Sequence, residues 1–131
     1  MSVYQRSAAG AVRSRVRDFL KTFAGAPPTP EENRIRLELV LRMRIELVAG
    51  QGDLLRVLGP TAAADALGDP ERIAAYAETL AAEAMISEAA GHTERADAIR
   101  RHAVAIAREG QRRAVAPDAE LDQLIARGGQ L

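Results

Sequence analysis

The stretch RIRLELVLRMRIELV, residues 34–48, constrains the fold more than any other part of the chain. Its apolar residues alternate almost strictly with arginine and glutamate, which is the period of a half-buried β-strand. A single strand of this length would exceed the usual range of roughly 3–10 residues. It would also need a partner strand, and the sequence contains no second alternating stretch. A strand is therefore the weaker of two interpretations.

The same stretch makes a consistent helix. Leucine, arginine, glutamate and methionine dominate it, and all four are good helix formers. On a helix its charges form a ladder of alternating sign at successive i, i+4 steps: Arg34, Glu38, Arg42 and Glu46. A helix start precedes it, since Thr29 can cap, Pro30 suits the first position and Glu32 completes a capping box. We therefore predict a long helix that starts at Thr29.

Similar start and stop signals divide the whole chain. We predict one all-α domain over residues 1–131, a helical bundle with about four main helices and several short ones. Its expected parts are a basic amphipathic helix with a proline-rich linker (1–28), a capped long helix with short helices (29–68), a helical hairpin (69–110, its helices at about 70–109) and a short C-terminal helix and tail (111–131). GAPPTP (25–30) and GQGD (50–53) should break the chain on either side of the long helix. We expect Gly91 to turn the hairpin and Gly110 to end its second helix.

Composition excludes several classes of protein. The chain has no cysteine, which excludes disulfides, thiolate metal sites and a cysteine nucleophile. No apolar run approaches the roughly 20 residues of a membrane span, and no signal-peptide pattern occurs. Lys21 is the only lysine among 18 basic residues, and such a preference for arginine is typical of a GC-rich genome. We therefore expect a bacterial, cytoplasmic protein.

The charges balance overall but are distributed unevenly. The 18 basic residues cancel the 18 acidic ones, yet residues 1–26 and 95–113 are basic and residues 65–94 are acidic. These segments can form complementary faces, within one chain or across a dimer, or the basic ends can bind an acidic partner or nucleic acid.

The basic helix predicted for residues 3–23 has two possible positions. This amphipathic helix can pack in the bundle, or it can lie on an anionic membrane or on a partner.

Two arginines interrupt the apolar arc of the predicted long helix. Arg36 and Arg44 are eight residues apart and lie among leucine, valine and methionine. They can extend their guanidinium groups to water along apolar surface. They can also pair with carboxylates of the acidic segment, or bind an anionic ligand. Both are candidate partner or ion-pair residues.

A second group of arginines lies in residues 99–113. The candidate phosphate contacts are Arg100, Arg101, Arg108, Arg112 and Arg113. No helix-turn-helix pattern and no stacking aromatic residues accompany them, and the net charge of the chain is zero. Nucleic-acid binding is therefore the alternative to a protein partner.

Neither histidine has the spacing of a metal ligand pair. His92 and His102 are ten residues apart, whereas two ligands on one helical face are separated by three or four. No G-x-S-x-G motif, phosphate-binding glycine loop or dinucleotide fingerprint occurs. We predict surface histidines, no metal, no cofactor and no catalytic residue.

The region around Gly91 resembles a tetratricopeptide hairpin. The resemblance covers about residues 77–110 and rests on five positions: Leu80, Ala84, Gly91, Ala96 and Ala103. It implies two antiparallel helices that meet at small residues, and a role in protein–protein interaction. Polar residues stand at four positions where the family has large apolar ones: Glu83, Ser87, Asp97 and Arg100. No functional residues carry over from the family, whose arrays need about three repeats.

A carboxylate pair offers a second resemblance. Glu94 and Asp97 are spaced as in the all-α nucleotide pyrophosphohydrolases, although the E-E-x-x-E stretch of that family is missing.

We predict a non-catalytic protein–protein interaction or adaptor module that is homo-oligomeric. Its partner surface would be the side of Arg36 and Arg44 or the exposed face of the hairpin. The alternative is a nucleic-acid-associated regulator that uses residues 95–113, and a metal-dependent all-α hydrolase is third.

Overall fold

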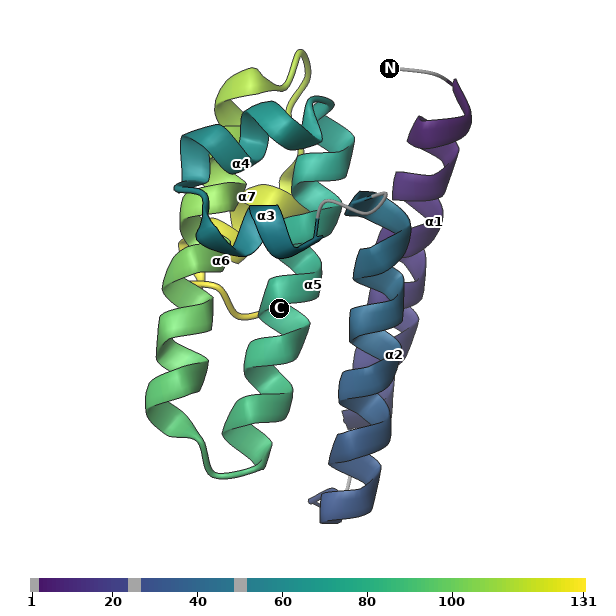
Figure 1. Cartoon of the computed structure of the whole chain (residues 1–131), viewed down its shortest axis with the longest axis vertical. Helices are drawn as coiled ribbons and strands as arrows, with labels where there is room; N and C mark the ends of the chain where they lie inside the picture. The colour runs from purple at the N-terminus through teal and green to yellow at the C-terminus, as the bar shows by residue number, and fades with distance from the viewer. Residues whose placement is uncertain (1–2, 24–26, 49–51) are drawn as a thin grey trace.

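The computed structural model describes residues 3–23, 27–48 and 52–131 (Figure 1). In chain order its elements are α1 (Val3–Leu20), a 3₁₀ turn η1 (Lys21–Phe23), α2 (Pro30–Val48), α3 (Gly52–Val57), α4 (Pro60–Leu67), α5 (Pro70–Ala89), α6 (Thr93–Arg113) and α7 (Ala119–Ala126). These described ranges contain no β-strand, so the predicted all-α helical bundle is confirmed. No helix within them has the length and apolar character that crossing a membrane requires.

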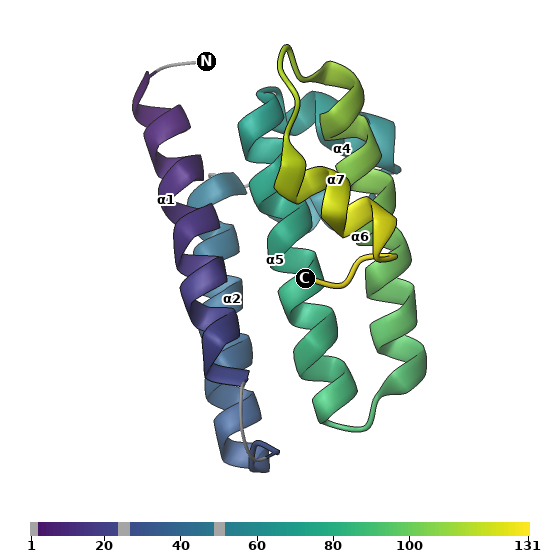
Figure 2. The same ribbon diagram turned by 180° about the vertical axis from the view of Figure 1, so that it is seen from behind.

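Four long helices lie side by side, with α5 at the centre. α6 packs along one side of α5, and the antiparallel pair α1 and α2 packs along the other (Figure 1). α7 crosses α5 and α6 on the face that is seen from behind (Figure 2). The apolar stripe of α1 is buried at Val12, Val16 and Phe19. In this structure α1 is therefore a bundle helix, and its apolar side is not free for a membrane.

α5 can occupy the centre because many of its buried side chains are small. Alanine dominates its sequence, and residues 73–84 are buried without interruption. Small side chains let neighbouring helix axes approach closely. Asp69 caps the start of α5, where its side chain accepts a hydrogen bond from the Glu71 N–H at 2.7 Å.

The alternating stretch lies in α2, which confirms the helical interpretation of residues 34–48. The capping box also forms as predicted. Thr29 Oγ1 accepts a hydrogen bond from the Glu32 N–H at 3.1 Å, and the Thr29 N–H donates to Glu32 Oε1 at 3.3 Å. One side of α2 buries Val40 and Leu47 against its neighbours α1 and α5.

The predicted breaks beside α2 lie partly outside the described residues, which omit 24–26 and 49–51. The described parts agree with the prediction. Residues 27–29 are not helical, α2 ends at Val48, and α3 begins at Gly52. The short helices α3 and α4 then lead into α5.

α5 and α6 form the predicted antiparallel hairpin, which turns at Gly91 with φ +86°. The prediction that Gly110 ends the second helix is wrong, because α6 continues to Arg113. A Cβ atom at Gly110 would lie 3.1 Å from Ile73 Cγ2 and 3.3 Å from Leu121 Cδ2. Gly110 therefore allows α5, α6 and α7 to approach one another, and it does not stop the helix.

Candidate interaction surface

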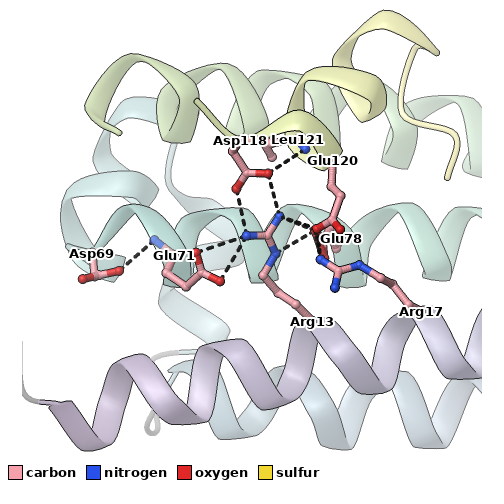
Figure 3. Close-up of polar contacts among 8 residues, drawn as sticks. All are labelled: Arg13, Arg17, Asp69, Glu71, Glu78, Asp118, Glu120 and Leu121. Carbon is pink, nitrogen blue, oxygen red and sulfur yellow. Dashed lines mark hydrogen bonds and ion pairs between the residues drawn. The ribbon is translucent and has the colours of Figure 1, made fainter. Parts of the chain in front are cut away.

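A group of charged residues around the buried side chains of Arg13 and Glu78 joins α1, α5 and α7, and we call it the Arg13 cluster (Figure 3). Its members are Arg13, Arg17, Glu71, Glu78, Asp118 and Glu120. Arg13 is 5% exposed, and its Nε donates to Glu78 Oε1 at 2.8 Å. Its two Nη groups donate to both Asp118 oxygens at 2.8 and 3.0 Å, a bidentate geometry. Nη1 also donates to Glu71 at 3.1 Å. One guanidinium thus connects three helical regions.

The pKa values of the two most buried carboxyls of this cluster, Glu78 and Asp118, shift in opposite directions. Burial raises the pKa of Glu78, which is 2% exposed, and the hydrogen bond from Arg13 offsets this only in part. Burial also acts on Asp118, but hydrogen bonds from Arg13 and from the Leu121 N–H bring the pKa of Asp118 below its usual value. Burial alone would lower the pKa of Arg13, yet its hydrogen bonds to Asp118 and Glu78 raise that pKa. Arg13 is therefore the fixed counter-ion of the cluster.

This geometry suits a structural role. The guanidinium of Arg13 lies between the carboxylates and donates hydrogen bonds to Glu71, Glu78 and Asp118 (Figure 3). Elsewhere in the described part of the chain, too, no three His, Asp or Glu side chains gather as metal ligands. Arg13 is not among the residues predicted from the sequence as a site. The one signal for the cluster was the basic charge of residues 1–26 opposite the acidic charge of residues 65–94.

The two arginines predicted as partner residues lie on the inner side of α2. Arg44 donates from Nε to Thr79 Oγ1 at 3.1 Å and forms an ion pair with Glu83 at 2.7 Å. This is the ion-pair alternative, with a carboxylate of the acidic segment. Arg36 donates to the Thr22 carbonyl at 2.8 Å, and its guanidinium carbon lies 4.4 Å from the Phe23 ring centroid. Both guanidinium groups are thus used inside the chain, in contacts that hold α2 to its neighbours.

The histidines differ from one another. His92 is exposed beside the hairpin turn, as predicted. His102 is half-buried, so the prediction of a surface histidine is wrong there. Burial and, to a smaller extent, the charge of Arg44 lower the pKa of His102.

Three of the five arginines predicted to bind phosphate have partners within the chain. Arg100 is buried and pairs with Asp97 at 2.6 Å and Glu88 at 3.1 Å. Arg112 pairs with Glu109, and Arg113 pairs with Asp65 and Glu109. Arg101 and Arg108 are exposed, and no described residue pairs with either. The structure therefore leaves two of the five guanidinium groups free on α6.

The outer side of α2 combines charge with exposed apolar surface. We call this the α2 outer face: Arg34, Ile35, Glu38, Leu39, Arg42, Ile45 and Glu46. Ile45 is 64% exposed, Ile35 is 44% exposed and Leu39 is 41% exposed. Single exposed apolar side chains are common, but a group of them on one face marks an interaction surface. The helix therefore has apolar residues on both sides, and only one side is covered by the bundle.

The charges of the α2 outer face are incompletely paired. Arg34 contacts Glu31 and Glu38 along the helix, and Glu46 contacts Arg15 of α1. Arg42 is exposed, and it has no ion-pair partner among the described residues. The face thus presents one free guanidinium among three exposed apolar side chains.

A cleft of about 510 Å³ lies between the start of α2 and the tip of the hairpin. Leu37 and Ile86 contribute apolar walls, and His92 and Arg95 also line it. Asn33 is buried there, and its Oδ1 has no hydrogen-bond partner among the described residues. This cleft belongs to the hairpin side that sequence analysis considered as a partner surface. Its apolar walls are less exposed than the apolar side chains of the α2 outer face, because Leu37 is half-buried and Ile86 is buried.

Comparison with known protein families, with curated proteins and with solved structures finds no match to this chain. The resemblance to a tetratricopeptide hairpin therefore stays a prediction. The functional conclusion rests on the surfaces of the chain itself.

Proposed function

We propose that this protein is a non-catalytic helical interaction module that self-associates through the α2 outer face. The observation that carries the proposal is the exposure of Ile35, Leu39 and Ile45 on one face of a helix whose other face is already packed. Burying one such side chain is worth roughly 1.5–3 kcal/mol, so a few of them can support association.

The rest of the molecule supports a structural reading of its charged groups. Arg13 donates hydrogen bonds to Glu71, Glu78 and Asp118, and these hydrogen bonds connect helices. Arg36 and Arg44, which sequence analysis offered as partner residues, are used inside the chain. The proposed contact surface therefore lies on the same helix as these two arginines, but on the opposite side.

Sedimentation velocity over a concentration series tests the proposal. The wild-type protein should shift from monomer toward dimer as concentration rises, and Ile35→Gln/Ile45→Gln should remain monomeric. Glutamine is a good helix former, so α2 should persist in this variant. The control is Val115→Gln, which changes a fully exposed apolar residue outside α2 and should leave association unchanged. A wild-type monomer at every concentration, or equal behaviour of the two variants, would contradict the proposal.

Nucleic-acid binding is the second candidate, and the free guanidinium groups of Arg101 and Arg108 favour it. These residues are seven apart on α6 and share a helical face. The chain has two tyrosines and no tryptophan, so co-purified nucleic acid would dominate its ultraviolet spectrum. A nucleic-acid band in wild-type protein that disappears after a high-salt wash, and that is absent in Arg101→Gln/Arg108→Gln, would support this candidate. A weak tyrosine spectrum at low salt would reject it.

A further inference from the structure

We propose that two copies of the chain pair through α2 in antiparallel orientation, about a two-fold axis that passes between Glu38 and Arg42 on the α2 outer face. This inference rests on the proposed function and names the partner of the same surface. In the pair, Ile35 lies opposite the partner's Ile45, and Glu38 lies opposite the partner's Arg42. The facing residues follow from the order of residues on the α2 outer face.

The first observation is the spacing of four exposed residues. Ile35, Glu38, Arg42 and Ile45 follow one another at intervals of three, four and three. These are the intervals of the core positions in a heptad repeat. At 100° per residue they fall within an arc of about 80°, on the side away from the buried Val40. The α2 outer face therefore carries a complete two-heptad seam with no helix packed against it in the described chain.

The second observation is the order of residues along that seam, which reads apolar, acidic, basic, apolar. In an antiparallel pair, the first core position of one heptad faces the second core position of the other helix. Ile35 then meets the partner's Ile45 at both ends, and Glu38 meets the partner's Arg42 in both central layers. Arg42, which has no partner within the described residues, thereby gains a carboxylate.

Other arrangements of the same two helices are less favourable. A parallel pair would place Glu38 against the partner's Glu38 and Arg42 against the partner's Arg42, and like charges repel. An antiparallel pair shifted by one heptad would set Ile35 against the partner's Glu38, or Ile45 against the partner's Arg42. It would also leave half of the seam uncovered. Only the unshifted antiparallel register matches all four positions.

The residues beside the seam fit the same axis. Leu39 is 41% exposed and lies at one edge of the seam. The two-fold axis between Glu38 and Arg42 brings Leu39 close to the partner's Leu39. The two leucine side chains then cover the central ion pairs. Shielding from water strengthens such pairs. An interface of this kind is isologous, because each residue contact occurs twice with the two chains exchanged.

Charge reversal tests the register. Glu38→Arg places arginine against the partner's Arg42, and Arg42→Glu places glutamate against the partner's Glu38. Each single variant should associate about tenfold more weakly than wild type or worse. The exchange variant Glu38→Arg/Arg42→Glu should recover association, because its central layers are complementary again. An equimolar mixture of the two single variants should also associate, as a heterodimer. The fold control is the helical circular dichroism of each variant, and the charge control is Arg108→Glu on α6.

The possible results separate this inference from the proposed function. Weak single variants together with a recovered exchange variant, or a recovered mixture, support the antiparallel register. A wild-type dimer whose association is unchanged by the single variants, or not recovered by exchange and mixing, overturns the register but leaves self-association in place. A wild-type protein that stays monomeric up to about 1 mM, where association would be worth only about 4 kcal/mol, overturns both.

Discussion

The Arg13 cluster and the α2 outer face use the same residue types in opposite ways. In the cluster, a guanidinium that is 5% exposed is held by carboxylates from α5 and α7. On the α2 outer face the charges are exposed, Arg42 has no partner in the described chain, and isoleucine and leucine lie between them. Arg13 of the cluster completes the fold of one chain. Arg42 of the α2 outer face is available for a partner.

The largest effect is expected from a substitution that disrupts the Arg13 cluster. Arg13→Gln removes the counter-ion of a buried carboxylate, and loss of one member of a buried pair costs about 3–5 kcal/mol in the free energy of unfolding. Arg42→Gln is the matched change on the α2 outer face and should alter stability by less than about 0.5 kcal/mol. Denaturant unfolding followed by circular dichroism measures both. Equal losses in the two variants would remove the distinction between the regions.

A double variant sharpens this comparison. Arg13→Met/Glu78→Met removes both charges and fills their space with side chains of similar length. The double variant removes Glu78, the most buried carboxylate of the cluster, together with its counter-ion, whereas Glu71 and Asp118 lose Arg13 in both variants. The double variant should therefore unfold at higher denaturant concentration than Arg13→Gln. If it is the less stable of the two, packing and not charge explains the loss.

A smaller effect concerns pH and Glu78. Burial raises the pKa of Glu78 in the folded chain above its ordinary value of 4.5. The folded state therefore binds this proton more tightly than the unfolded state does. The Glu78 contribution to stability is complete below pH 4.5 and is lost as pH rises through the raised pKa. Glu78→Gln should remove this decrease from the stability profile between pH 4.5 and neutrality. A profile with unchanged slope in that range would contradict the assignment.

The smallest expected effect lies at His102, a half-buried residue of α6. Burial lowers the pKa of His102 below its ordinary value of 6.5, with a further contribution from Arg44. The unfolded state binds this proton more tightly, so stability should fall as pH decreases below 6.5 and through the lowered pKa. His102→Gln should flatten that decrease, whereas His92→Gln changes an exposed histidine and serves as the control. Identical profiles for both variants would show that His102 does not contribute.

The helices could be predicted from sequence because their signals are local. Thr29 and Glu32 are three residues apart, and both capping hydrogen bonds form as expected. Gly91 turns the hairpin through its own backbone geometry. Gly110 shows the limit of such signals. Its role depends on Ile73 and Leu121, which belong to other helices.

The Arg13 cluster could not be predicted, because its contacts are distant in sequence. Arg13 lies 58 residues from Glu71, 65 from Glu78 and 105 from Asp118. The charge ladder of α2 was predictable, but its surroundings were not. The leucines of this helix contribute to its predicted apolar arc, yet Leu39 is 41% exposed, because α1 and α5 pack against the other side of α2. Arg100 and Arg113 likewise form ion pairs with carboxylates from other helices, Glu88 and Asp65.

Disulfide trapping tests the α2 pair most directly, because the chain has no native cysteine. The account predicts a disulfide-linked dimer when Ile35→Cys and Ile45→Cys proteins are mixed in a redox buffer. Each variant alone should remain unlinked. Two copies of position 35 would lie about 15 Å apart along the antiparallel helices, beyond the roughly 7 Å that a disulfide can span between Cα atoms. No linked dimer in the mixture, or equal linkage in each variant alone, would contradict the account.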